Sequence, residues 1–305
     1  MIRKNTVFVL GAGASVPYMF PPGRSLIGDI CNLESNTSFH SYLDRAYPGL
    51  DPVANFKILS ESLWGSPVPS IDQFLEHHLE FLDFGKFAIA YYFNNIHETH
   101  LKDRVNYNRD WYLSLFQEYL YERKFSDFLN NNIKFVTFNY DVSLEMFFHR
   151  AISSMFSVVQ ADLEEFFNKI EIVHIHGKIR SWPWESSGVT NVSELNLLPH
   201  QIKKISENDI YLIHEDSPFG RTINRAKSII DSAEIVIFLG FGFHARNLDK
   251  LQINWDFRRR PFESTSVNLT PAMHKVINKR CVNKVGFIEM DCNNYLLNKI
   301  DSLTA

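Results

Sequence analysis

A short glycine-rich segment, Gly11-Ala12-Gly13-Ala14-Ser15, directly follows an apolar run and has the composition of a phosphate-binding loop. Gly11 permits a tight turn, and Gly13 lets the backbone approach a pyrophosphate at the start of the next helix. The full G-x-G-x-x-G pattern is absent because Val16 occupies the third glycine position. Alone, the motif therefore also fits an ordinary small-residue turn between a strand and a helix.

A second group of polar residues is Thr137-Phe138-Asn139-Tyr140-Asp141. The amide of Asn139 can both donate and accept hydrogen bonds, which suits it to hold a ribose hydroxyl or a water molecule. Simpler interpretations remain open for both polar side chains. Asp141 could cap the following helix, and Asn139 could be a turn residue in the left-handed conformation.

Two histidines stand close together in His174-Ile175-His176-Gly177. Residues two apart on a strand share a face, so a metal-binding pair is one interpretation. No carboxylate stands at a recognisable spacing to complete such a site, and no metal is expected. His176, followed by Gly177, is a candidate general base, with a buried core histidine as the alternative.

A fourth motif, Phe238-Leu239-Gly240-Phe241-Gly242-Phe243-His244, precedes Arg246-Asn247-Leu248. Gly240 and Gly242 would allow backbone amides to approach a nucleotide closely.

The surrounding pattern predicts how these motifs are positioned. Short β-branched and aromatic runs predict buried strands at 6–10, 133–138, 172–176, 235–239 and 284–290, and less clearly at 210–213. Apolar residues at helical spacing predict helices at 71–82, 111–120, 144–155 and 223–230. This alternation predicts an α/β fold with a doubly wound, mostly parallel, Rossmann-like sheet. Ligands bind at the carboxyl ends of such strands, where all four motifs stand.

The spacing of the predicted strands is uneven. About 120 residues separate the first two strands, against ~30 in one βαβ unit. We therefore expect one domain over 1–305 with a helical insertion lobe at about 18–125. The stretch at about 180–220, rich in Ser, Pro, Asn and Trp, predicts a long loop or lid.

Composition narrows the functional classes. The chain of 305 residues has 31 Lys and Arg against 35 Asp and Glu, a net charge of −4, so direct nucleic-acid binding is not expected. The run Arg258-Arg259-Arg260 is expected to be a solvated basic segment, with contact to nucleic acid or a partner as the alternative. Cys31, Cys281 and Cys292 form no C-x-x-C pair, which fits a reducing compartment without a cysteine zinc site. No apolar run could cross a membrane and the start is a poor signal peptide, so we expect a cytoplasmic protein.

Taken together and in this order, the four motifs resemble the sirtuin-like NAD-hydrolysing domains of bacterial antiphage defence systems. The G-A-G-x-S loop is matched by Gly11, Ala12, Gly13 and Ser15, and T-x-N-x-D by Thr137, Asn139 and Asp141. The H-G pair is matched by His176 and Gly177, and the later G-x-[SG] turn by Gly240 and Gly242. The matches run from residue 7 to about 251. The zinc ribbon and the G-I-P-D-F-R segment of deacylase sirtuins are missing, and a segment containing Arg24 stands in place of the latter.

The resemblance implies an NAD glycohydrolase that releases nicotinamide and ADP-ribose, with NAD as substrate and no zinc. Asn139 and His176 would be catalytic, and the other matched residues would bind the nucleotide. It also implies a homo-oligomer or a separate partner such as a HerA-like hexameric ATPase. Three alternatives remain open: a non-catalytic NAD or ADP-ribose-binding regulatory subunit, a metal-dependent hydrolase using His174 and His176, and a deacylase that works without zinc.

Overall fold

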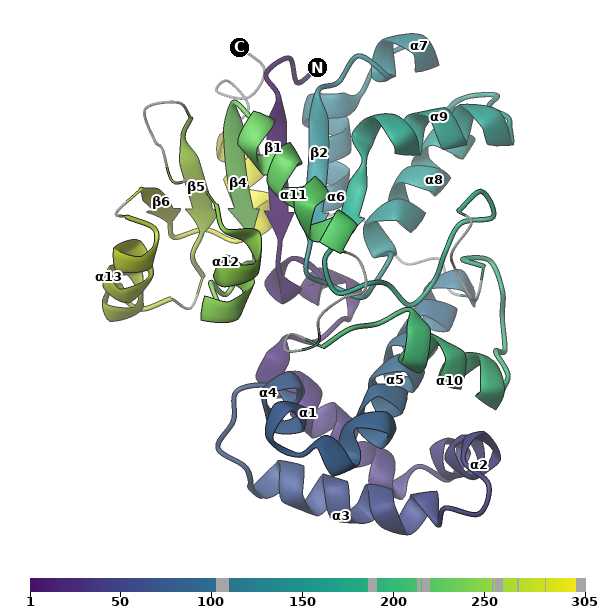
Figure 1. The fold of residues 1–305 in the computed structure, drawn as a ribbon. Coiled ribbons are helices and arrows are strands. Elements are labelled where there is room, and N and C mark those ends of the chain that lie inside the picture. Colours follow the sequence, from purple (N-terminus) through teal and green to yellow (C-terminus); the bar gives the residue numbers. More distant parts are fainter. Residues whose placement is uncertain are drawn as a thin grey trace.

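A six-stranded parallel sheet forms the centre of the upper part of the molecule (Figure 1). The computed structural model describes residues 1–102, 110–185, 191–212, 215, 220–253, 255, 260–267, 269–282 and 284–299. The strands are β1 (Thr6–Leu10), β2 (Ile133–Thr137), β3 (Ile172–His174), β4 (Ile235–Leu239), β5 (Phe262–Thr265) and β6 (Val285–Ile288). Their order is β3-β2-β1-β4-β5-β6, which is the order of a Rossmann fold. The predicted α/β class is confirmed.

Helices cover both faces of the sheet, which explains why the strands are apolar throughout. In β1, Val7 and Val9 pack in a core with α11 (Gly220–Ser232), α12 (Ala245–Leu251) and α13 (Pro271–Arg280). Phe8 and Leu10 point the other way, into a core with α8 (Ser143–Met155), α9 (Gln160–Ile170) and α14 (Cys292–Asn298). Alternating side chains therefore fill two separate cores, and neither face of β1 meets water.

Five of the strands lie where the sequence predicts them, although most are shorter than expected. The strand β5 was not predicted, because only four residues pair there and the polar Glu263 and Ser264 interrupt the apolar pattern. The weaker candidate at 210–213 is described at residues 210–212, which are not a strand of the sheet, whereas residue 213 lies outside the described residues. Its one recorded pairing is an isolated antiparallel bridge between Ile210 and Gly177.

The long segment between β1 and β2 is helical, and much of it lies below the sheet in Figure 1. Its helices are α1 (Gly23–Asn32), α2 (Thr37–Ala46), α3 (Pro52–Gly65), α4 (Ile71–His77) and α5 (Leu82–Lys102). The chain then returns to the sheet through α6 (Trp111–Ser114), which continues as a π-helical turn, and α7 (Phe125–Phe128). The helix α10 (Pro199–Asn208) packs against α2 and α5 from a distant part of the sequence.

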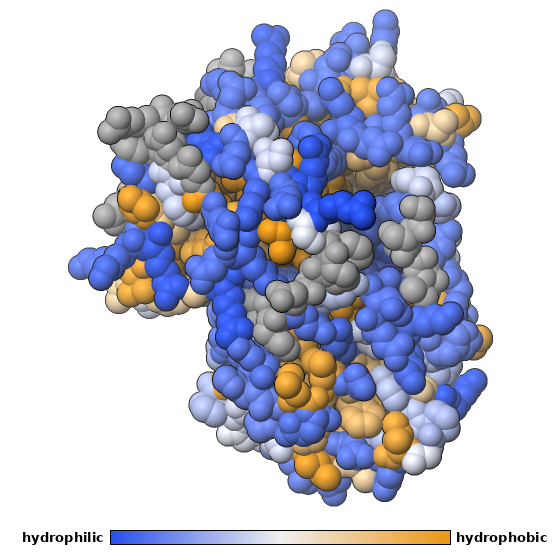
Figure 2. All heavy atoms as spheres, in the orientation of Figure 1, coloured by the Kyte–Doolittle hydropathy of each residue, from blue (hydrophilic) through white to orange (hydrophobic). Residues whose placement is uncertain are grey.

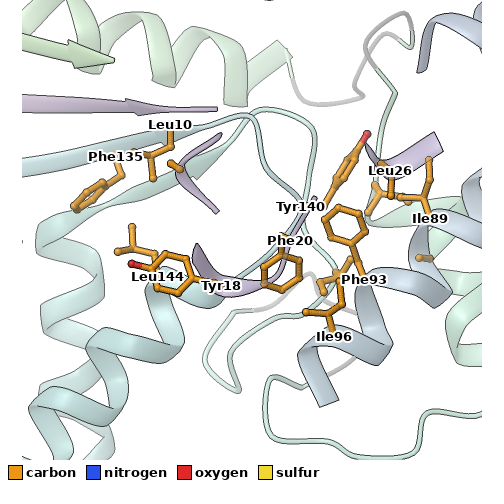
Figure 3. Packing of buried hydrophobic residues seen from close by; sticks show 14 of the residues in the cluster. Leu10, Tyr18, Phe20, Leu26, Ile89, Phe93, Ile96, Phe135, Tyr140 and Leu144 are labelled. Atoms are coloured by element: carbon orange, nitrogen blue, oxygen red, sulfur yellow. The ribbon is translucent and has the colours of Figure 1, made fainter. Parts of the chain in front are cut away.

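The interior is continuous between the sheet and the helices below it. Phe20 packs against Phe93 of α5 with ring centres 5.5 Å apart, and Phe93 meets Tyr140 edge-on at 5.9 Å (Figure 3). Tyr140 follows β2, so these rings connect α5 directly to the carboxyl edge of the sheet. The face of the molecule that Figure 2 shows is largely hydrophilic, with scattered apolar patches. No helix in the described part of the chain is long and apolar enough to cross a membrane.

Two expectations from the sequence need correction. The predicted loop at 180–220 contains the helix α10 at 199–208, which an apolar stripe of Ile202 and Ile205 anchors to its neighbours. Residues 186–190, 213–214 and 216–219 of that stretch lie outside the described residues. Arg260 is not solvated: it is 5% exposed and donates hydrogen bonds to the carbonyl and carboxylate oxygens of Asp231. Arg258 and Arg259 lie outside the described residues.

Candidate nucleotide site

The strand order places a topological switch point between β1 and β4, where chain connections leave in opposite directions. In open α/β sheets, ligands bind in the crevice at this point, beyond the carboxyl ends of the strands. Here the two loops at the crevice are the segments 11–15 and 240–244. They are directly hydrogen bonded: Gly11 N–H donates to the carbonyl of Leu239, and Gly13 N–H donates to that of Gly240, each at 3.0 Å.

The close contact between these loops requires glycine. Gly240 has φ +56°, and a Cβ there would lie 2.1 Å from the backbone nitrogen of Ala14. A Cβ on Gly11 would lie 2.6 Å from the Gly240 carbonyl oxygen. The N–H of Gly13 is already paired with Gly240, and the N–H of Gly240 donates to Thr265 Oγ1 at 2.9 Å. These glycines therefore join two loops, a function that the sequence motif alone did not indicate.

A cavity of about 670 Å³ opens at the crevice between the two loops. Of the predicted binding residues, it contains Ala12, Gly13, Gly240 and Gly242. The opposite side is formed by Trp111 together with Thr265, Val267, Leu269, Asp291 and Cys292 from the ends of β5 and β6. A cavity of this size is large enough for part of a dinucleotide.

A second, smaller cavity of about 150 Å³ lies on the other side of Ala12. Ala12 and Gly23 line both cavities, so the two are adjacent. Besides Ala12, the smaller cavity brings together four more predicted residues: Ser15, Asn139, Asp141 and His176. Its remaining lining is largely aromatic and apolar, with Asp72 and Asn247 as further polar groups. The two cavities therefore meet at Ala12 and Gly23.

Asn139 is 8% exposed and is held firmly by its amide nitrogen. Its Nδ2 donates to the carbonyl of Gly11 at 3.0 Å and to Ser15 Oγ at 2.9 Å. Its backbone N–H donates to Thr137 Oγ1 at 3.1 Å. Since both Nδ2 hydrogens are used inside the protein, Oδ1 is the atom through which Asn139 can meet a ligand, and it can only accept.

His176 lies against the rings of Phe138 and Tyr140. Burial, assisted by the nearby positive charge of Lys250, lowers the pKa of His176 to about 3. The imidazole is therefore neutral near pH 7. Its Nε2 lies 3.3 Å from Asn247 Oδ1. The amide oxygen of Asn247 can only accept, so Nε2 carries the hydrogen and Nδ1 is the basic nitrogen. This tautomer is assigned from the hydrogen-bond pattern.

Asp141 lies beside these residues with its carboxylate buried. Burial raises the pKa of Asp141, while hydrogen bonds from Ser143 and Ser15 oppose the rise. Asp141 is not the N-cap of α8, which is Val142, although its Oδ1 accepts a hydrogen bond from the Ser143 N–H at 3.1 Å. The Ser143 hydroxyl also bonds to Asp141 and lies 2.7 Å from the Tyr112 hydroxyl. Asp141 thus begins a buried polar chain that ends on α6.

Residues from the segment between β1 and β2 fix the loop at 11–18. Trp111 Nε1 donates to the carbonyl of Ala14 at 2.8 Å. Tyr18 stacks on Tyr112 with ring centres 3.7 Å apart and an interplanar angle of 7°. His100 of α5 contacts the Tyr18 carbonyl through Nε2 at 2.8 Å. The short 3₁₀ turns that follow Gly11 are therefore held by long-range contacts and not by a regular helix.

Three predicted binding residues, Gly11, Thr137 and Gly177, line neither cavity. Gly177 has φ +76°, and a Cβ there would lie 1.9 Å from the Asp209 carbonyl oxygen, so its glycine is needed for chain packing. Thr137 orients the backbone of Asn139. Arg24 donates hydrogen bonds to the carbonyls of Ser66 and Val68.

The metal-binding interpretation of His174 and His176 is not supported by their positions. The strand β3 ends at His174, so the two histidines are not on one regular strand face. His174 contacts Glu145 and the Asn139 carbonyl, whereas His176 contacts Asn247. Within the described ranges, no group of three or more metal-ligating side chains converges.

Sequence reasoning missed three residues that complete the site. Asn247 follows the glycine-rich turn, and no role was predicted for it from the sequence. Its position as a polar residue in the first turn of α12 is a signal that could have found it. Thr265 was missed together with strand β5. Asp72 comes from α4, and nothing in its local sequence indicates that it reaches the smaller cavity.

No model of a known protein family matches the chain. No curated protein matches it either. Among solved structures, it is similar to a Sir2 homologue in a complex with NAD, with 13% identity and a TM-score of 0.43, over 98% of this chain and 88% of the other. It is also similar to Sir2Tm bound to a propionylated peptide, with 14% identity and a TM-score of 0.38, over 97% and 92% of the two chains. A third is Sir2 with the inhibitor EX-527, 2'-O-acetyl-ADP-ribose and a deacetylated p53 peptide, with 14% identity and a TM-score of 0.39, over 97% and 93%. At these values the likeness says nothing about what this chain binds or catalyses.

Proposed function

We propose that the chain is an NAD glycohydrolase. The observation that carries this proposal is the pair of adjacent cavities at the switch point, the smaller of which holds a neutral, buried His176 beside Asn139. The larger cavity would take the adenosine end of NAD. The pyrophosphate would pass Ala12, and the nicotinamide ribose would lie in the smaller cavity.

The reaction breaks the bond between the ribose C1′ and the nicotinamide nitrogen. The pyridinium carries a positive charge and leaves as neutral nicotinamide, so no strong general acid is needed. Positive charge develops on the ribose as an oxocarbenium ion, as in glycoside hydrolysis. A water oxygen then bonds to C1′ and releases one proton, which gives ADP-ribose.

The proposed roles rest on Oδ1 of Asn139 and on the neutral imidazole of His176. Asn139 Oδ1 would accept a hydrogen bond from the attacking water or from a ribose hydroxyl, since its Nδ2 is fixed on Gly11 and Ser15. His176 is uncharged and would take the proton from the water or polarise a ribose hydroxyl. A general base works best with a pKa near the operating pH, so the lowered pKa of His176, about 3, limits this contribution. Phe20, Phe93 and Phe138 would keep bulk water from the reacting centre.

The test is incubation of the purified chain with NAD, with chromatography of the products. We expect nicotinamide and ADP-ribose from the wild type and none above background from His176→Ala at a temperature where the variant is folded. Full turnover by His176→Ala would refute the assignment. Four further parts of the proposal rest on the resemblance of the motifs. These are a role in antiphage defence, oligomer formation, an ATPase partner and a cytoplasmic location.

The second candidate is a regulatory subunit that binds NAD or ADP-ribose without cleaving it. It is favoured by the hydrogen bonds of Asn139 and Asp141, because both side chains bind neighbouring protein groups and therefore have a structural role. Calorimetry separates the two functions. Binding of NAD with no nicotinamide released, in the purified chain and in cells that express it, would support this second candidate.

A further inference from the structure

A buried histidine–glutamate pair lies behind Asn139, outside the two cavities described above. His174 ends β3, Glu145 lies in the first turn of α8, and their side chains are 5% and 4% exposed. His174 Nε2 lies 2.7 Å from Glu145 Oε1. His174 Nδ1 lies 3.0 Å from the backbone carbonyl oxygen of Asn139. The imidazole thus bridges α8 and the residue that follows β2.

The Asn139 carbonyl oxygen can only accept, so Nδ1 of His174 carries the hydrogen of that bond. Burial raises the pKa of Glu145, but the charge and hydrogen bond of His174 and the charge of Lys178 outweigh burial and bring that pKa below its usual value.

The other charges around His174 are mostly engaged with one another. Lys178 Nζ pairs with Glu185, at 2.6 and 2.7 Å from its two carboxylate oxygens. The neighbouring cavity beside β3 contains Glu171, Asp209, Arg221 and Arg225. Of these, Glu171 accepts from Arg225 and from Lys134. Glu145 is thus the carboxylate that His174 contacts directly.

We propose that His174 and Glu145 are positioning residues for the reaction, because the His174 ring anchors the Asn139 carbonyl to α8 and thereby sets where the Asn139 amide lies in the smaller cavity. The proposal rests on the proposed function.

The hydrogen bond to Asn139 is tested without any reference to activity. Two-bond ¹H–¹⁵N spectra of the histidine-labelled full chain show which ring nitrogens carry a hydrogen, and His174→Asn assigns the signal by its loss. We expect Nδ1 of His174 to carry a hydrogen, because the Asn139 carbonyl can only accept. A His174 ring with a hydrogen on Nε2 alone would overturn the proposal whatever the enzyme does.

The positioning role is tested by two double variants. His174→Ala with Glu145→Ala removes the anchor, and we expect kcat to fall by about 10–100-fold while KM changes little, as expected for a misplaced reacting group. His174→Asn with Glu145→Gln keeps an uncharged donor near the Asn139 carbonyl. We expect it to restore most of kcat.

The matched control is Lys134→Gln on β2, which breaks the partly buried ion pair of Lys134 with Glu171 and leaves the contacts of Asn139 in place. Its kcat should equal that of the wild type. Wild-type kcat in the double alanine variant would overturn the proposal, as would an Asn/Gln variant as slow as a folded Ala/Ala variant. If the wild type binds ADP-ribose but turns over no NAD, the proposed function fails. The positioning role is then tested by the affinity for ADP-ribose: a loss in the double alanine variant that the Asn/Gln variant restores would support it, and equal affinity in all variants would overturn it.

Discussion

Replacing Gly240 by alanine should separate the two loops at the switch point. The new Cβ would lie 2.1 Å from the Ala14 nitrogen and 2.3 Å from the Gly13 carbonyl carbon. All the nearest atoms belong to the backbone, so no side chain can rotate away to relieve the contact. The loops must therefore move apart, and the crevice between the two cavities must change shape.

The size of the effect can be worked out from three contributions. Alanine at φ +56° is in the left-handed region, which costs about 1–2 kcal/mol. Moving the loop breaks the bond from Gly13 N–H to the Gly240 carbonyl and the bond from Gly240 N–H to Thr265, each worth about 1 kcal/mol. We expect the free energy of unfolding to fall by about 3–4 kcal/mol.

Equilibrium unfolding in urea measures this loss, and Gly242→Ala is the matched control. A Cβ on Gly242 meets no atom within 4 Å, so the same substitution there should change the free energy of unfolding by less than about 0.5 kcal/mol. Gly240→Ala should also abolish NAD turnover at temperatures where it remains folded. Equal stability of the two variants would show that the loops are not packed as described.

Three further predictions follow from the site. Asn139→Ala should lower the free energy of unfolding by about 1–3 kcal/mol as well as abolishing turnover, because it leaves Ser15 and the Gly11 carbonyl without their donor; unchanged urea unfolding would contradict this. The folded protein keeps His176 unprotonated down to its pKa of about 3, whereas the unfolded chain binds a proton below about 6.5. The free energy of unfolding should thus fall by ~3 kcal/mol between pH 7 and pH 4 through this group, and His176→Gln should lose less in urea titrations at the two pH values. EDTA should leave NAD turnover unchanged, since both nitrogens of His174 are engaged with Glu145 and Asn139; loss of turnover that zinc restores would revive the metal-dependent hydrolase.

The sequence by itself determined the α/β class, most of the strands, and the edge of the sheet at which the four motifs stand. These features are readable because a strand covered on both faces must be apolar along its whole length, as in Thr6–Leu10 and Ile235–Leu239. The position of Asn139 and His176 just after their strands follows from the same local pattern. No contact between distant residues is needed to read it.

Tertiary structure alone decided what the motif residues do. Gly13 and Gly240 bond to each other's loops because β1 and β4 are neighbours, a pairing across more than two hundred residues of sequence that no local pattern records. His176 is neutral because the surrounding rings and Lys250 remove the stabilisation that water gives an imidazolium, whereas His174, two residues away, gains a carboxylate partner from α8. Burial and partners set the charge of a side chain, and both arise only when distant segments pack together.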